Sequence, residues 1–428
     1  MYPARSRRLL LRRARRSRNR PWQRQAQAAA PVRRTMGTVL NNHLEQSRTP
    51  AVVVGLCGHG LAIVRALHQG NMPIFALEAS ASQPGTRTRL AKVEFVADIN
   101  GPGLIDALLA LRRRLDCPGA PILFLTNDTM VRTIGIGWER LNDAYRLSWS
   151  HARESLLPLL EKSALEARCM ATGLAYPKTY LLRATSDVGL ATHAVNFPII
   201  VKPARPLSRF KTALPATPTD LRELADKFRE DLPFLVQQFI PGDDTSIQFC
   251  ALYLDHGKVL ARFDGHKLRS RPLGHTSIAE SAVDDKVFEQ TCSFFSGLNL
   301  SGPVSLELKR DGRGGLWVIE PTVGRTDFWI DLCTTNGVNL PLTEYCHQAG
   351  TAAPHALQQD AFVWFNEDRD PLGRLWFMLQ RSLRLHGRHS TYLYLHRSDP
   401  RPALVAITRI ATDLLRSLGR RVGKLFAR

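Results

Sequence analysis

Two glutamates thirteen residues apart, Glu307 and Glu320, are the residues whose type and spacing point most directly to chemistry. Each lies in a short run of alternating apolar residues, and the segment 311–315 (Asp-Gly-Arg-Gly-Gly) separates the runs. The pattern predicts a β-hairpin with the two glutamates on adjacent antiparallel strands. If both face the same side, a divalent cation such as Mg²⁺, shared with phosphate oxygens, is their expected partner. The alternative is a solvated hairpin face that carries two unrelated acids.

The strongly basic composition belongs to the two ends of the chain. The formal net charge of the 428 residues is +20, of which residues 1–36 contribute +12 and residues 371–428 contribute +10. The part between them is therefore close to neutral, at −2. A body of that charge argues against a broad surface for phosphate backbones, so no specific nucleic acid is expected as a partner.

The cysteines and the hydropathy indicate a cytoplasmic protein. Seven cysteines are scattered without a CxxC pair or a metal-ligand cluster, which is typical of thiols in a reducing compartment. No stretch approaches eighteen consecutive apolar residues, so no membrane-spanning helix is predicted. Residues 1–48 are rich in arginine and lack an apolar period, which predicts a disordered tail, and Met36 is an alternative start.

Residues 49–150 alternate strands and helices as a parallel sheet does. An apolar strand from 51 leads into a turn with Gly55, Gly58 and Gly60, and a helix and a second strand (73–78) follow. A helix over 104–115 and a strand over 121–128 continue the alternation, which predicts an open Rossmann-like sheet. The glycine turn admits a nicotinamide dinucleotide as an alternative, with Glu78 on the ribose, although the spacing G-x-x-G-x-G is not the usual one.

Residues 151–350 have the pattern of an α+β region. A helix is predicted over 162–172, a strand ending at Lys202, a helix over 219–230 and a strand over 234–240. Two further strands, 246–254 and 258–263, are joined by a turn at 255–257. A lysine at the end of an apolar strand needs a partner or a ligand, because burying it unpaired costs several kcal/mol.

In this order the segments resemble the ATP-grasp superfamily over roughly residues 51–345, and in particular its carboxylate–amine ligase-like members, related to D-alanine–D-alanine ligase and the large subunit of carbamoyl-phosphate synthetase. The resemblance implies an α/β and α+β architecture. A Rossmann-like pre-ATP-grasp domain (49–150) would precede a two-lobed ATP-grasp domain (151–350), with a small lobe at about 162–238 and a large lobe at about 239–350. A C-terminal extension (351–428) would follow.

The same resemblance implies roles for individual residues, with ATP and Mg²⁺ (or Mn²⁺) as cofactors. The phosphates of ATP would meet Lys162, Lys202 and Lys267, the adenine Gln237 and Ile240, and the ribose Asp244. The metal ligands would be Glu307, Glu320 and Thr322. The catalytic residues would be Arg325, Arg269 and Lys267.

Two segments depart from the family pattern. Thr322 stands where the family usually has asparagine, and its hydroxyl is a weaker metal ligand. The loop 204–211 carries Arg205, Arg209 and Lys211 where the family is rich in glycine, so side-chain charge would replace backbone N–H contacts. The segment 334–341 resembles the glycine-containing loop that closes the domain in these relatives.

The implied activity is that of an ATP-dependent ligase, which activates a small-molecule carboxylate as an acyl phosphate for attack by an amine. The alternatives are a nucleotide-binding scaffold with little turnover and a nicotinamide-dependent enzyme. Neither the two substrates nor the oligomeric state follows from the sequence.

The C-terminal extension has the pattern of a basic amphipathic helix. From Leu404 to Leu425 apolar residues recur at steps of three and four, with arginines largely off that face. This predicts peripheral association with an anionic membrane at its inner face, and the alternative is a helix that packs on its own domain.

Overall fold

The computed structural model describes residues 49–204, 208–271, 274–380, 388–409 and 412. The chain separates into two compact units, Met1–Asn42 and His43–Arg428, and all of the described residues belong to the second. The Arg-rich tail predicted for 1–48 lies outside the described residues, and so does most of the predicted C-terminal helix.

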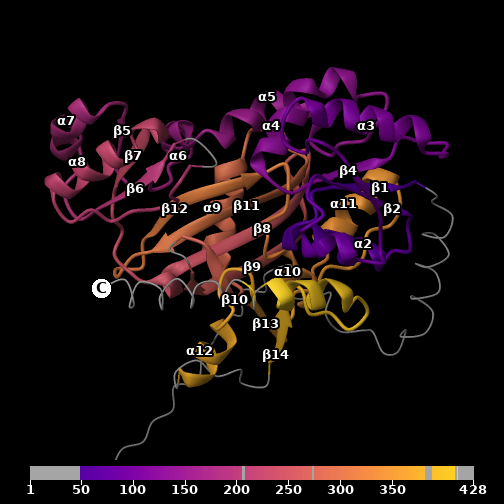
Figure 1. Ribbon diagram of the computed structural model, residues 1–428. Helices are drawn as coiled ribbons and strands as arrows, with labels where there is room; N and C mark the ends of the chain where they lie inside the picture. The colour runs from indigo at the N-terminus through magenta and orange to yellow at the C-terminus, as the bar shows by residue number, and fades with distance from the viewer. Residues whose placement is uncertain (1–48, 205–207, 272–273, 381–387, 410–411, 413–428) are drawn as a thin grey trace, which may run out of the picture. The chain divides into compact units, whose positions relative to one another are not determined.

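The first part of this unit is a four-stranded parallel sheet in the order β3-β2-β1-β4 (Figure 1). Residues 51–54 at its centre are completely buried, as the run of valines predicts. The sheet confirms the predicted parallel arrangement, and β3 is an additional strand that the sequence did not reveal. The strands are β1 (Ala51–Val54), β2 (Ile74–Glu78), β3 (Lys92–Phe95) and β4 (Ile122–Leu125), and the helices are α2 (Gly58–His68), α3 (Gly103–Arg114) and α4 (Asp128–Gly137).

A short helix α5 (Arg153–Leu156) leads to a small antiparallel sheet in the order β5-β7-β6. The apolar faces of helices α7 and α8 and of this sheet form a separate core around Phe234, Val201 and Leu221. A capping box at Thr217, which binds the amide of Asp220, begins α8, as the Thr-Pro-Thr-Asp sequence allows. The elements are α6 (Leu165–Thr172), β5 (Thr179–Leu182), α7 (Val188–Ala194), β6 (Ile199–Pro203), α8 (Pro218–Lys227) and β7 (Phe234–Gln238).

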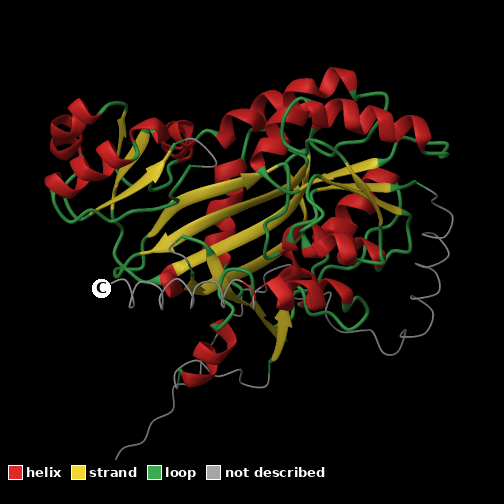
Figure 2. Cartoon of the chain, viewed as in Figure 1, coloured by secondary structure: helices red, strands yellow, loops and turns green. Residues whose placement is uncertain are grey.

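A seven-stranded sheet in the order β12-β11-β8-β9-β10-β13-β14 forms the largest layer (Figure 2). Its core joins that of the parallel sheet, because Leu252, Leu306 and Val52 belong to one apolar cluster. The bounds are β8 (Ile247–Asp255), β9 (Lys258–Ser270), β10 (Thr276–Ser281), β11 (Gly302–Arg310), β12 (Leu316–Val323), β13 (Phe362–Phe365), β14 (His389–Tyr392), α9 (Asp285–Phe295), α10 (Ile330–Thr335) and α11 (Leu340–Ala349).

The segment 334–341, expected to resemble a glycine-containing loop, forms a short loop at 336–339 between two helices. It contains the end of α10, a turn with Gly337 at φ 91°, and the start of α11. The Asn339 side chain caps α11 and donates a hydrogen bond to the carbonyl of Ala66 on α2. These contacts hold the loop 336–339 and the start of α11 against the parallel-sheet part.

The C-terminal segment contributes two strands to the large sheet. β13 pairs with β10, and β14 runs parallel to β13. A short helix, α12 (Gly373–Leu379), lies between them, and residues 401–409 are helical. Within the described part of the chain, no helix has the length and apolar character needed to cross a bilayer.

Candidate nucleotide and metal site

Glu307 and Glu320 are directly opposed on adjacent strands. β11 and β12 pair antiparallel with Glu307 opposite Glu320, which confirms the predicted hairpin. The next pair is Leu308 with Val318, so Ile319 is an extra residue that forms a β-bulge. Val318 is buried in the core, and a regular strand would turn Glu320 toward the core as well. The bulge therefore places both carboxylates on the face away from the core.

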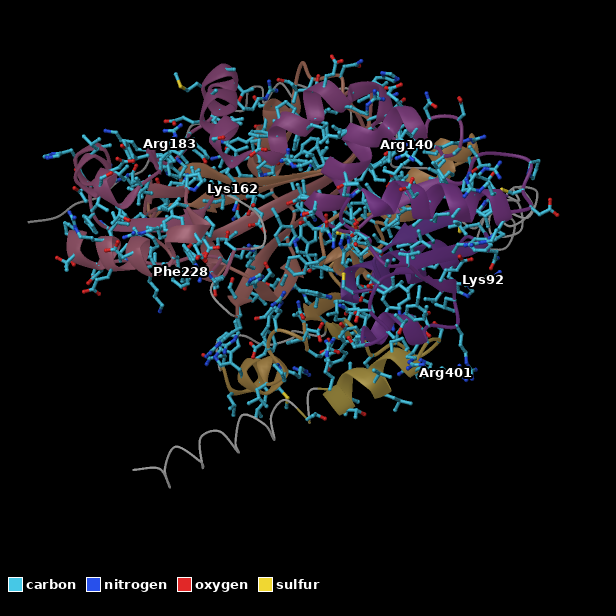
Figure 3. All side chains as sticks on the ribbon, turned by 45° about the horizontal axis from the view of Figure 1, so that its top comes forward. Lys92, Arg140, Lys162, Arg183, Phe228 and Arg401 are labelled. Atoms are coloured by element: carbon cyan, nitrogen blue, oxygen red, sulfur yellow. The ribbon has the colours of Figure 1, made fainter. Side chains whose placement is uncertain are left out.

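Three lysines contact or approach this glutamate pair. Lys267 on β9 is buried, and its ammonium donates to Glu307 Oε2 at 2.7 Å. The Lys162 ammonium lies 3.7 Å from Glu320 Oε1, and Figure 3 shows Lys162 where the small sheet approaches the large one. Lys202, at the end of β6, donates to the amide oxygen of Gln237 at 3.3 Å. The three lysines that the resemblance assigns to phosphate thus come from three separate elements to one place.

The charges of the lysines and glutamates act on one another. Burial alone would raise the pKa of Glu320, but Lys162, Lys211, Lys202 and Lys267 outweigh it and lower that pKa to about 2. Burial lowers the pKa of Lys202 to about 8, although Glu320 opposes the change. Four ammonium groups around two carboxylates leave a surplus of positive charge, which suits a polyanion such as a triphosphate.

The donor set of this cluster is compatible with Mg²⁺ shared with phosphate. The described residues contain no group of three or more His, Cys, Asp or Glu side chains that would hold a metal by themselves. Mg²⁺ binds readily through one or two carboxylates completed by phosphate oxygens and water. Glu307 and Glu320 provide that pair, and Glu320 keeps 38% of its side chain exposed to a ligand.

Thr322 is committed to another partner. Its hydroxyl donates to Asp327 Oδ1 at 3.0 Å, and the hydroxyl of Ser305, the residue paired with Thr322, donates to the other oxygen. Asp327 is buried, and this burial raises its pKa despite the nearby Arg325. The structure therefore gives a carboxylate beside Thr322 that the sequence analysis did not single out.

The two arginines expected to be catalytic are both held by aspartates. Arg325 Nε donates to Asp128 Oδ1 at 2.7 Å, and Asp128 is the first residue of α4 in the parallel-sheet part. Arg269 Nε donates to Asp370 Oδ2 at 2.7 Å. Each arginine retains only 15% side-chain exposure, so its position is fixed without a ligand.

The residues expected to bind adenine and ribose lie at the junction between the small and large sheets. Gln237 is buried on β7, where its amide nitrogen donates to Thr179 Oγ1 at 2.9 Å. Ile240 is also buried, just after that strand. The Asp244 carboxylate accepts a hydrogen bond from the backbone N–H of Ser270 at the end of β9.

The loop 204–211 is described only in part. Arg205 lies outside the described residues, and Arg209 pairs with Asp231, just before β7, at 2.8 Å instead of reaching the glutamates. Lys211 does interact electrostatically with Glu320 and Glu307. Of the two described basic residues of this loop, Lys211 joins the cluster and Arg209 does not.

The glycine turn of the parallel sheet is occupied by the protein itself. A Cβ on Gly60 would lie 1.8 Å from the carbonyl oxygen of Gly55, so close packing requires this glycine. The Leu393 side chain covers Gly58. The Glu78 carboxylate is buried and accepts hydrogen bonds from backbone amides that include that of Leu56. These contacts oppose the dinucleotide alternative, in which Glu78 would bind a ribose.

Sequence reasoning missed the acidic partners Asp128, Asp327 and Asp370. The only signal was the position of Asp327 two residues after Arg325 and seven after Glu320. Asp128 and Asp370 are far from their arginines in sequence, and only the fold brings them together.

Part of the chain is similar in sequence to a known ligase. No family model matches the chain. A D-aspartate ligase of Enterococcus faecium (strain Aus0004) is 26% identical over 204 residues, which cover 42% of this chain and 48% of that protein, so the match spans about half of the relative's length.

Among solved structures, the ADP complex of N5-carboxyaminoimidazole ribonucleotide synthetase superposes with a TM-score of 0.59 at 10% identity and covers 73% of this chain and 79% of the other. The L-amino acid ligase of Bacillus licheniformis superposes with a TM-score of 0.54 at 15% identity and covers 72% of this chain and 76% of that one. The chain therefore has the fold of the ATP-grasp ligases.

Proposed function

We propose that the chain is an ATP-dependent ligase that forms a C–N bond between a small-molecule carboxylate and an amine. One observation carries the proposal: Glu307 and Glu320 are opposed across β11 and β12 within a group of lysines that exceeds them in charge. This arrangement suits a magnesium–triphosphate. The D-aspartate ligase match and the ADP complex of a similar structure support the same reaction class.

In this proposal the lysines Lys162, Lys202, Lys211 and Lys267 bind the phosphates, and Lys267 also donates to Glu307. Gln237 and Ile240 line the adenine, and Asp244 accepts from the ribose hydroxyls. Glu307 and Glu320 hold Mg²⁺, with Thr322 beside them. The ion would neutralise charge on the transferred phosphoryl group.

The reaction has two steps. A carboxylate oxygen attacks the γ-phosphorus, and the bond to the ADP oxygen breaks, which gives an acyl phosphate and ADP. The amine then attacks the acyl carbon, inorganic phosphate leaves with the C–O electron pair, and the amine loses a proton. In this proposal Arg325 and Arg269 stabilise negative charge on the phosphoryl or acyl phosphate group. Their hydrogen bonds to Asp128 and Asp370 support the proposal, because the arginines need not become ordered during the reaction.

Amino acids are the first substrates to test. Two of the similar proteins, D-aspartate ligase and L-amino acid ligase, carry amino acids in their names. The experiment is release of inorganic phosphate from ATP and Mg²⁺ with a panel of amino acids as carboxylates and amines. Substrate-dependent release that needs both partners supports the ligase. ATP binding without release on any pair supports the second candidate below.

The second candidate is a nucleotide-binding scaffold with little turnover. The observation in its favour is that Thr322, Arg269 and Arg325 already have protein partners. Such a scaffold would bind ATP with the same dependence on Glu320 and release no phosphate. Nicotinamide binding is a weaker alternative, because Leu393 and Glu78 fill the required turn.

We also propose a cytoplasmic location with peripheral contact to the inner face of the membrane. All seven cysteines are free thiols, which suits a reducing compartment. In the described start of the C-terminal helix, Leu404 and Ile407 are 65% and 61% exposed. Both belong to the apolar face predicted from the sequence, and their exposure favours an external partner for it.

A further inference from the structure

The short helix α12 presents an apolar face that no described residue covers. Leu372, Leu375, Met378 and Leu379 are 61%, 53%, 65% and 71% exposed. Their spacing of three and four residues places Leu375, Met378 and Leu379 on one side of the helix. On the other side Phe377 is buried and packs edge-on against Phe365 of β13 at 5.6 Å. Among the described residues, the helix is thus anchored on one side and uncovered on the other.

This exposure is concentrated in the C-terminal part of the chain. The described residues include fifteen large apolar side chains that are exposed, and seven of them fall between residues 372 and 407. Elsewhere such residues occur singly, like Met170 on α6 and Leu190 on α7. Isolated exposed apolar residues are normal, whereas a cluster marks an interaction surface.

The charge of the sequence that contains α12 favours an anionic partner. The sequence 369–388 contains five arginines and one aspartate, and residues 371–428 carry a net charge of +10. Arg381 and Arg384 lie outside the described residues, and Arg388 pairs with Glu280 and Asp360. Two copies of such a segment would repel each other, so this face is poorly suited to a homodimer. Apolar side chains among arginines match an anionic bilayer, where the former enter the acyl boundary and the latter meet headgroup phosphates.

The anchored side of α12 reaches a residue of the proposed active site. The Arg269 guanidinium lies over the Trp376 ring, 4.0 Å from its centroid. Asp370, whose carbonyl accepts from the first amide of α12, also accepts from Arg269 Nε. Arg269 is two residues from Lys267 on β9, and the register of β9 against β10 shifts between them.

We propose that α12 docks on an anionic lipid surface and that docking is transmitted to Arg269 through Trp376. The docking itself is independent of the reaction, whereas the role given to Arg269 rests on the proposed function. The surface consists of Leu372, Leu375, Met378 and Leu379, with Arg369 and Arg374 beside them.

The docking is tested by sedimentation of the full chain with vesicles. We expect it to bind vesicles that contain phosphatidylglycerol and not vesicles of phosphatidylcholine alone. The variant Leu375→Ser/Met378→Ser/Leu379→Ser should lose at least about ten-fold in affinity, because each side chain loses apolar burial in the bilayer. The control Met170→Ser/Leu190→Ser removes equally exposed residues elsewhere and should bind like the wild type.

Equal binding by the α12 variant and the wild type would overturn the proposal and assign the affinity to another basic segment. Failure of the wild type to bind phosphatidylglycerol vesicles would overturn it as well. The substituted side chains are exposed, so the melting temperature of the variant should match that of the control, which shows that it is folded.

The link to Arg269 has its own readout. The emission of Trp376, taken as the difference between the wild type and Trp376→Phe, should change when phosphatidylglycerol vesicles are added. An unchanged difference spectrum with bound vesicles would refute the link. Titration of ATP and Mg²⁺ into the α12 variant without lipid should match the wild type, so loss of nucleotide binding and loss of lipid binding are separate results.

Discussion

Substitution of Glu320 by glutamine should change nucleotide binding in opposite directions with and without Mg²⁺. Without the metal, Glu320 repels phosphate while the lysines attract it. The substitution removes one negative charge and leaves the lysines in place, so free ATP should bind more tightly. With the metal, the substitution removes one of two carboxylate ligands, and ATP should bind more weakly.

The size of the effect follows from the charges at the site. The lowering of the Glu320 pKa from 4.5 to about 2 corresponds to about 3 kcal/mol in favour of the ionised carboxylate, which is what remains of the attraction by the lysines after the cost of burial. Because 38% of the side chain is exposed, solvent screening reduces the usable part to about 1 kcal/mol. We therefore expect free ATP to bind about five-fold more tightly to Glu320→Gln in EDTA. In Mg²⁺ we expect at least about ten-fold weaker binding, from the loss of a metal ligand.

The assay is isothermal titration of ATP in EDTA and in Mg²⁺, with wild type, Glu320→Gln and the control Glu223→Gln. Glu223 is an exposed glutamate on α8, and its substitution should change neither affinity. A decrease for Glu320→Gln in both buffers, or no dependence on Mg²⁺ in any protein, would refute the reasoning.

Three further predictions concern protonation and packing. With its pKa near 8, Lys202 loses its proton as the pH rises through 8, so ATP affinity measured by isothermal titration should fall between pH 7 and about 9.5. The fall should be smaller in Lys202→Arg, whose cation persists, and an equal fall in both proteins would contradict this. Burial raises the pKa of Glu344 from 4.5 to about 8. As the pH rises, the unfolded chain loses the Glu344 proton at a lower pH than the folded protein does, so stability is lost between pH 4.5 and 8. Glu344→Gln should therefore stabilise the protein against urea at pH 7, by up to about 3 kcal/mol, and not at pH 4; the same gain at both pH values would be evidence against a neutral Glu344. Gly60→Ala should destabilise the protein by more than about 2 kcal/mol, because the new Cβ would overlap the Gly55 carbonyl. The control Gly189→Ala on α7, with open space around it, should be neutral or stabilising, and equal melting temperatures of the two variants would contradict the close packing at Gly60.

The sequence predicted the elements whose signals are local. The hairpin of Glu307 and Glu320 was legible because a glycine-rich turn separates two alternating strands. The buried strand at 51–54 was legible because four consecutive residues are apolar. The lysines could be assigned because their order along the chain matched a known fold.

The features that were missed depend on distant parts of the chain. The bulge at Ile319, which turns Glu320 out of the core, depends on pairing with β11 and leaves no mark in the local pattern. Strands β3 and β13 are four residues long, too short for a clear period. The hydrogen bond from Asn339, at the end of the loop 336–339, to α2 is a contact across more than 270 residues and leaves no local signal.

The most direct test of the account is the position of a metal ion bound together with nucleotide. Crystals grown with Mn²⁺ and a non-hydrolysable ATP analogue would locate the ion by its anomalous scattering. We expect it between the carboxylates of Glu307 and Glu320, coordinated by both and by phosphate oxygens. A bound nucleotide whose metal touches neither glutamate would contradict the account.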